Sequence, residues 1–177
     1  MSRILVAYKS HYGSTRQYAE WIAEELGADF KAHREIKPQE LMDYDCVVYG
    51  GALYAGGIIG LDLVTKHPTR HLVLFTVGAA DPASTDYTVI LNRGLSGKPN
   101  RPDHVFHLRG MLDYPNMTRT HRVMMAMKKR MVVGNKKTEE LLDEDRAFLE
   151  TYGKKVGFLN RATIAPLVDY VRSQGGT

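Results

Sequence analysis

The first residues that could do chemistry form a hydroxyl-rich segment near the N-terminus. It lies between an apolar run at residues 4–8 and an amphipathic helical pattern, so we expect it to connect a strand to the start of a helix. Such a loop offers backbone N–H groups, hydroxyl groups and the positive end of a helix dipole, which together can hold a phosphate. The candidate binding residues of this loop are Ser10, His11, Tyr12, Gly13, Ser14 and Thr15.

The order of residues in this loop restricts the kind of phosphate. The three-glycine pattern of a dinucleotide site is absent, and no Gly-Lys-Ser/Thr follows as in a P-loop. Because the loop has no lysine to offset a triphosphate, it suits one terminal phosphate monoester. Taken alone, the segment is equally compatible with a capped turn between a strand and a helix, with Ser14 as the N-cap.

A second group of candidates follows the clearest buried strand, residues 45–51. Tyr54 stands among small residues and glycines, and glycines let a backbone approach a flat ligand closely. The tyrosine ring could stack on such a ligand, and the alternative is an ordinary surface aromatic side chain. The candidates in this loop are Ala52, Leu53, Tyr54, Ala55 and Gly56.

A third loop follows the buried strand at residues 71–77. Its small residues could present backbone N–H groups to the polar edge of the same ligand. The candidates there are Thr76, Val77, Gly78 and Ala79.

Alternating strands and helices must position these loops. We predict one domain, residues 1–177, with a three-layer, doubly wound α/β fold of five parallel strands in the order 2-1-3-4-5. In that order the three loops meet at the carboxyl edge of the sheet, beside the switch point where ligands bind. The predicted strands are 3–8, 29–33, 45–51, 71–77 and 105–109, and the predicted helices are 14–26, a short one near 61–67, 82–95, 138–152 and 164–171.

The first two loops resemble the flavodoxin signature. In that family a strand and a Ser/Thr-x-x-Gly-x-Thr loop hold the phosphate of FMN, as residues 4–15 would here, and the loop resembling 51–56 places an aromatic ring against the isoalloxazine. The resemblance implies an FMN flavoprotein in which the flavin itself carries the electrons. Within this group, the runs 101–103 and 110–115, with the basic segment after them, are similar to those of the bacterial protoporphyrinogen IX dehydrogenases, which pass electrons to quinone.

The positive charge of the chain is concentrated in one segment. Residues 110–137 hold seven Lys and Arg and one Asp, a charge of +6 in a chain of net +4, which leaves −2 for the rest. We predict a helical basic insertion over 110–152. Its part from 117 to 133 interleaves Met and Val with cations, which suits an apolar redox ligand such as a porphyrinogen or quinone, an anionic membrane surface or a redox protein. The alternative is a surface helix whose Met and Val side chains pack on the core.

Composition and motifs argue against several other classes of protein. The single cysteine, Cys46, excludes an intrachain disulfide framework, and we expect it to be an inert buried thiol. The N-terminus lacks signal-peptide features, so we expect a cytoplasmic protein, with contact at the inner face of the membrane through residues 117–133 as an alternative. The histidines form no metal-ligand spacing, and no nucleic-acid motif accompanies the basic segment. We therefore predict an FMN-dependent oxidoreductase, with a non-catalytic electron carrier and a flavin-free binding module as alternatives.

Overall fold

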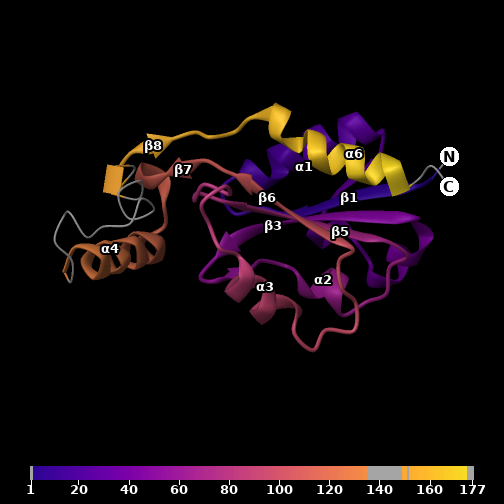
Figure 1. The fold of residues 1–177 in the computed structure, drawn as a ribbon, viewed down its shortest axis with the longest axis horizontal. Coiled ribbons are helices and arrows are strands. Elements are labelled where there is room, and N and C mark those ends of the chain that lie inside the picture. Colours follow the sequence, from indigo (N-terminus) through magenta and orange to yellow (C-terminus); the bar gives the residue numbers. More distant parts are fainter. Residues whose placement is uncertain (1, 135–148, 151, 175–177) are drawn as a thin grey trace.

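A parallel sheet forms the centre of the molecule, which is described here from a computed structural model covering residues 2–134, 149–150 and 152–174 (Figure 1). The five strands run in the order β2-β1-β3-β5-β6, which is the predicted 2-1-3-4-5 order. A two-residue strand, β4, pairs antiparallel with the end of β3, and β7 and β8 form a separate ribbon. The strands are β1 (Ile4–Lys9), β2 (Asp29–Ala32), β3 (Cys46–Tyr54), β4 (Gly57–Ile58), β5 (Leu72–Gly78), β6 (His104–Arg109), β7 (Leu112–Asp113) and β8 (Lys155–Val156).

Helices cover both faces of the sheet, so the central strands are buried on both sides. In Figure 1, α1 and α6 lie above the sheet and α2 and α3 lie below it. Successive residues of β3 alternate between the two cores, with Val48 facing α1 and α6 while Val47 and Tyr49 face the other side. The helices are α1 (Ser14–Leu26), α2 (Asp62–Thr65), α3 (Thr88–Leu95), α4 (Arg119–Gly134) and α6 (Ala165–Gln174), with short 3-10 turns at 33–35, 38–43, 114–116 and 161–164.

Helix α3 begins six residues later than predicted. The Asp81 backbone carbonyl accepts hydrogen bonds from the Ser84 and Thr85 hydroxyls, and the Asp86 carboxylate accepts one from the Thr88 amide. These short side chains bond the local backbone in turns, which competes with helix formation. The predicted helix at 138–152 lies almost entirely outside the described residues.

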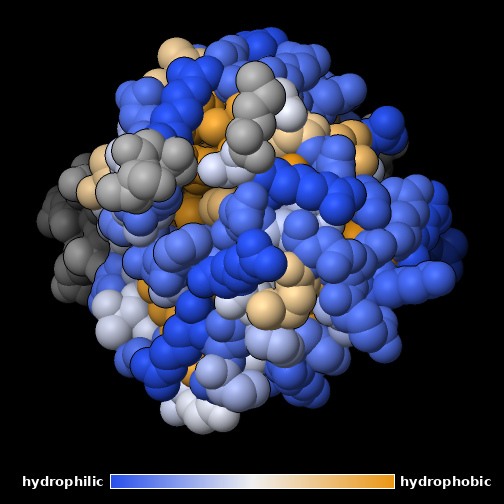
Figure 2. All heavy atoms as spheres, turned by 90° about the vertical axis from the view of Figure 1, so that its right-hand side faces the viewer, coloured by the Kyte–Doolittle hydropathy of each residue, from blue (hydrophilic) through white to orange (hydrophobic). Residues whose placement is uncertain are grey.

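Helix α4 lies beyond the carboxyl edge of the sheet, at the left of Figure 1. Of its residues only His121 is buried, which argues against the alternative in which its Met and Val side chains pack on the core. Figure 2 shows the opposite end of the molecule, where hydrophilic residues cover most of the surface. Among the described residues, five of the eight large exposed apolar side chains are on α4: Val123, Met124, Met127, Met131 and Val133.

None of the helices within the described ranges is both long and apolar enough to cross a membrane.

Candidate functional site

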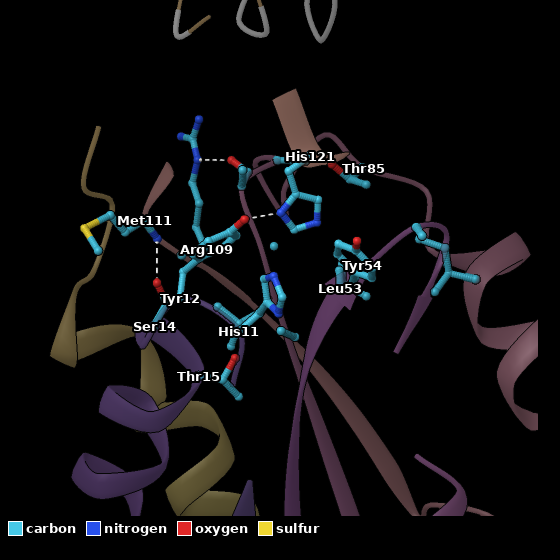
Figure 3. A pocket seen from close by; sticks show the side chains of 18 of the residues that line it. His11, Tyr12, Ser14, Thr15, Leu53, Tyr54, Thr85, Arg109, Met111 and His121 are labelled. Atoms are coloured by element: carbon cyan, nitrogen blue, oxygen red, sulfur yellow. Dashed lines mark hydrogen bonds between the residues drawn. The ribbon is translucent and has the colours of Figure 1, made fainter. Parts of the chain in front are cut away.

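A cavity of about 620 Å³ opens at the carboxyl edge of the sheet, where the three predicted loops meet. This volume lies in the range of pockets that hold small molecules and cofactors. The walls come from the loops after β1, β3, β5 and β6, and from the cavity-facing side of α4. Side chains from these separate elements point toward one another in Figure 3.

The hydroxyl-rich loop forms one end of the cavity. Ser10 Oγ accepts a hydrogen bond of 2.9 Å from the Gly13 amide, and Gly13 has φ of 95°, a left-handed conformation that favours glycine. Helix α1 starts at Ser14, so the N-terminal amides of a 13-residue helix and its dipole face this end.

Ser14 is the first helical residue, and Gly13 is the N-cap, which corrects the expectation that Ser14 caps the helix. Ser14 Oγ accepts a hydrogen bond of 2.9 Å from the backbone amide of Met111, which follows β6 (Figure 3). A hydroxyl that accepts in this way keeps its proton to donate elsewhere, so Ser14 can still bond an anion. The Ser14 contact also joins the loop after β1 to the segment that leads into α4.

The segment after β3 is a hairpin. Leu53 pairs with Ile58 and Tyr54 with Gly57, so only Ala55 and Gly56 form the turn. Both have positive φ, 49° and 75°, as the two central residues of a type I′ turn require. The hairpin holds Tyr54 at the cavity, where its ring lies 5.1 Å from that of His11.

His121 connects α4 to these rings. Its Nδ1 is hydrogen-bonded to the Tyr12 hydroxyl, and its ring centroid is 4.2 Å from that of Tyr54 and 4.9 Å from that of His11 (Figure 3). Burial lowers the pKa of His121, and the nearby His11 lowers it further, so the imidazole is held neutral at pH 7. The cavity-facing side of α4 and its approach consists of Met117, His121, Met124, Met125 and Lys128.

Arg109, at the end of β6, supplies a positive charge at the rim. Its Nε donates to the Ala79 carbonyl at 3.1 Å, and Nη1 lies 3.6 Å from an Asp81 carboxylate oxygen. The guanidinium also lies 3.6 Å from the ring centroid of Phe158. The first two contacts hold Arg109 against the loop after β5, and the third holds it against the segment after β8.

Most of the predicted site residues line this cavity: Ser10, His11, Tyr12, Ser14, Thr15, Ala52, Leu53, Tyr54, Ala55, Val77, Gly78 and Ala79. Gly13, Gly56 and Thr76 do not. Thr76 is buried and its hydroxyl is 2.6 Å from His107 Nδ1, while the Gly56 carbonyl faces Arg93 on the other side of the hairpin. Cofactor contacts stay predictions for all of the predicted site residues, including those that line the cavity.

The glycines at positions 50 and 51 have a different role from the one inferred from sequence. A Cβ at Gly50 would lie 2.1 Å from Phe75 Cζ, and one at Gly51 would lie 2.3 Å from Ile58 Cγ2. Both glycines therefore admit neighbouring side chains of the protein itself, where the sequence suggested close approach to a ligand.

Several lining residues were missed from sequence. Tyr87, Ile90, Ser84 and Thr85 come from the segment around α3, Arg109 is the last residue of β6, and Gly110 and Met111 follow it. The last three could have been found, because residues after the fifth strand of such a sheet must emerge at the same edge as the other loops. No group of three or more His, Cys, Asp or Glu within the described residues could hold a metal ion.

The fold and the site together define a class of protein: a doubly wound α/β protein with a phosphate-type loop and an aromatic-lined cavity at the switch point of the sheet. The sequence profile of the flavodoxin domain family matches residues 5–139, which is more than half of the chain. The chain therefore belongs to the flavodoxin domain family.

The chain is also similar in structure to several solved proteins. One is a flavoprotein in complex with FMN from Lactobacillus acidophilus NCFM, at 16% identity over 60% of this chain and 93% of that chain, with a TM-score of 0.45. Another is oxidised Flavodoxin 1 from Bacillus cereus, at 16% identity over 61% and 84%, with a TM-score of 0.45. A third is the flavodoxin WrbA-like protein from Agrobacterium tumefaciens, at 23% identity over 52% and 69%, with a TM-score of 0.42. No curated protein matches the chain by sequence.

Membership of the flavodoxin domain family supports FMN as the cofactor. The residues that line the cavity fit both ends of FMN, its phosphate and its ring system. The Ser14 hydroxyl and the α1 amides suit a phosphate, and the cavity volume and the rings of Tyr54 and His11 suit a flat ring system.

Proposed function

We propose that the protein is an FMN-dependent oxidoreductase whose redox substrate is an apolar molecule such as a porphyrinogen or a quinone. The observation that carries this proposal is a single cavity lined both by the phosphate-type loop and by Met117, Met124 and Met125. Methionine side chains are flexible and polarizable, so they fit irregular apolar ligands. FMN supplies the reversible uptake and release of an electron pair at its ring.

Named residues of the chain have distinct tasks in this proposal. Ser10, Ser14 and Thr15 bind the phosphate, and Tyr54 orients the ring. Helix α4 covers the cavity, excludes water and places its methionines against the substrate. His121 holds α4 in place through its contacts with Tyr12, Tyr54 and His11. These contacts therefore set how tightly α4 closes the substrate side of the cavity.

The cofactor part of the proposal is tested by FMN affinity. Replacing Ser14 by Ala removes one hydroxyl donor to a charged phosphate, a bond that contributes about 1.5–3 kcal/mol. We expect Ser14→Ala to weaken FMN binding at least about tenfold, measured by quenching of flavin fluorescence. Ser173→Ala is the matched control, because its hydroxyl bonds the Tyr170 carbonyl on α6, away from the cavity. Equal affinity in both variants would refute the phosphate assignment.

The substrate part is tested by anaerobic reduction of the flavin, followed by its absorbance. A porphyrinogen or a quinol should reduce it, and Met124→Ser should slow this reaction, while reduction by dithionite stays unchanged. Met131→Ser is the control, since Met131 is on the same helix, is 72% exposed and does not line the cavity. If only protein reductases reduce the flavin, the enzyme proposal fails.

A second candidate is an electron carrier that docks a redox protein, since proteins of this family commonly act with redox partners. The observation in its favour is the exposed apolar face of α4, where Val123, Met127 and Met131 lie among Arg and Lys. The same face supports peripheral contact with an anionic membrane. Flotation with anionic vesicles separates membrane contact from protein docking. If α4 contacts lipid, Met127→Glu should abolish flotation of the protein. If α4 docks a redox protein and does not contact lipid, the substitution should leave flotation unchanged.

A further inference from the structure

A second cavity, of about 580 Å³, lies on the other side of the β3–β4 hairpin. Ala52 to Ala55 line the cofactor cavity, whereas Gly57 and Ile58 line this one, and the two cavities share no lining residue. The hairpin that carries Tyr54 is therefore a wall between them. The proposed function uses nothing in this second cavity.

The lining of the second cavity is strongly basic. It contains four cations, Lys9, Lys66, Arg93 and Lys98, and one carboxylate, Asp62. Lys98 Nζ lies 2.6 Å and Lys66 Nζ 3.0 Å from the Asp62 oxygens, so one carboxylate is shared by two ammonium groups. Counted from these four cations and Asp62, the cavity has a formal charge of +3, although the chain outside residues 110–137 is net negative.

These cations come from elements that are far apart in sequence. Lys9 ends β1, Lys66 follows α2, Arg93 is on α3, and Lys98 lies in the turn after it. A cleft lined by charges of one sign concentrates the field and attracts counter-ions. Convergence of these four cations from three separate parts of the chain, at residues 9, 66 and 93–98, points to an anionic ligand more than to a solvated charged helix face, which would draw them from one segment.

Side chains of the protein pack closely against Gly60 at the floor of this cavity, so packing and backbone conformation both favour glycine at this position. Gly60 has φ of 74°, and a Cβ there would lie 2.2 Å from Tyr49 Oη, 2.7 Å from Lys9 Cδ and 2.9 Å from His33 Nδ1. His33 Nδ1 is in turn 3.0 Å from the Tyr49 hydroxyl. Burial lowers the pKa of His33 and the charge of Lys9 lowers it further, as expected at a positively charged floor.

We propose that this second cavity binds a small ligand through a phosphate or diphosphate group. The volume is that of a small-molecule pocket, and its charge matches a group with two or more negative charges. Arg93 supplies a planar guanidinium that can bond two phosphate oxygens, and the lysines supply compact charges around it. Arg93 Nη1 now donates only a 3.3 Å bond to the Gly56 carbonyl, at the turn of the shared hairpin. A ligand that engages Arg93 thus acts directly on the wall that holds Tyr54.

Inorganic pyrophosphate, titrated calorimetrically into the FMN-loaded protein, tests this proposal, because FMN then occupies the other phosphate site. We expect saturable binding at one site, weakened about tenfold or more by Arg93→Gln and by Lys98→Gln. Arg130→Gln is the matched control, since it removes the same charge from α4, outside both cavities.

Three results would overturn the assignment. One is the lack of saturable binding up to about 5 mM pyrophosphate. Another is an equal loss of affinity in Arg93→Gln and Arg130→Gln, which would mean nonspecific attraction. The third is equal affinity for citrate, which would mean a general anion site without preference for phosphate. A thermal melt of each variant verifies that the substituted protein is folded.

Discussion

Replacing His121 by Ala should release α4 from the cofactor cavity while the sheet stays folded. His121 is the one buried residue of α4 within the described structure, at 8% exposure, and it contacts Tyr12, Tyr54 and His11. The lost hydrogen bond contributes about 0.5–1.5 kcal/mol. The ring contacts contribute about 0.5–1.5 kcal/mol. The sum, about 1–3 kcal/mol, corresponds to an opening equilibrium roughly 5 to 150 times larger.

Hydrogen exchange measured by mass spectrometry reports this opening directly. In His121→Ala, the amides of residues 119–134 should exchange roughly 5 to 150 times faster, whereas the exchange rates of the amides in β3 and β5 should not change. Tyr12→Phe removes only the hydrogen bond and should give a smaller acceleration. His71→Ala is the control, because that histidine is half exposed and pairs with Asp103 at the other end of the sheet. Unchanged exchange in α4, or equal acceleration in the central strands, would refute the inference that His121 holds the helix.

The same contact should depend on pH. Because the pKa of His121 is lowered in the docked state, undocked α4 binds protons more readily. Docking is therefore complete above the ordinary histidine pKa of about 6.5 and weakens as the pH falls from there through the lowered pKa. Exchange of α4, corrected for the intrinsic effect of pH, should rise between about pH 6.5 and pH 5 in the native protein and stay flat in His121→Ala.

Three further outcomes are expected. Ala55→Gly should stabilise the protein by up to about 1 kcal/mol in urea unfolding, because Ala55 has φ of 49° and glycine adopts it without steric cost; a loss of stability would contradict this. Gly50→Ala should destabilise it by about 1–3 kcal/mol through overlap with Phe75, whereas Gly157→Ala, which meets nothing within 4 Å, should change stability by less than about 0.5 kcal/mol. Burial raises the pKa of the Cys46 thiol to about 12, so iodoacetamide at pH 8 should modify the native protein at least about 100 times more slowly than the unfolded chain.

The strand order and most of the cofactor cavity could be predicted because they depend on local signals. Apolar runs such as residues 46–49 are buried on both faces, and the loops that follow such strands must meet at one edge. The hairpin was missed because Ala55-Gly56 is not one of the dipeptides that announce a type I′ turn. Only the pairing of Leu53 with Ile58 shows that the segment folds back on β3.

Features that depend on tertiary packing could not be read from the sequence. Helical periodicity shows that Met124 and Met131 lie on one helix, but it does not show whether another element covers them. For this reason the sequence alone left open whether the α4 Met and Val side chains pack on the core. Likewise, Lys9 and Lys98 are 89 positions apart, so no sequence window reveals that both line the second cavity.

The β7–β8 ribbon holds the two ends of the helical insertion together, so the insertion can be replaced without changing the rest of the fold. Leu112 pairs with Val156 and Asp113 with Lys155, so the insertion leaves and rejoins the sheet domain at adjacent points. A segment whose ends are already held together can change greatly in length, because the entropy of closing it grows only with the logarithm of that length. The sequence and length of the insertion can therefore diverge while the strands and loops around the cavity at the carboxyl edge of the sheet stay as they are. The ribbon also offers a place to graft the insertion of one flavodoxin-type protein onto another.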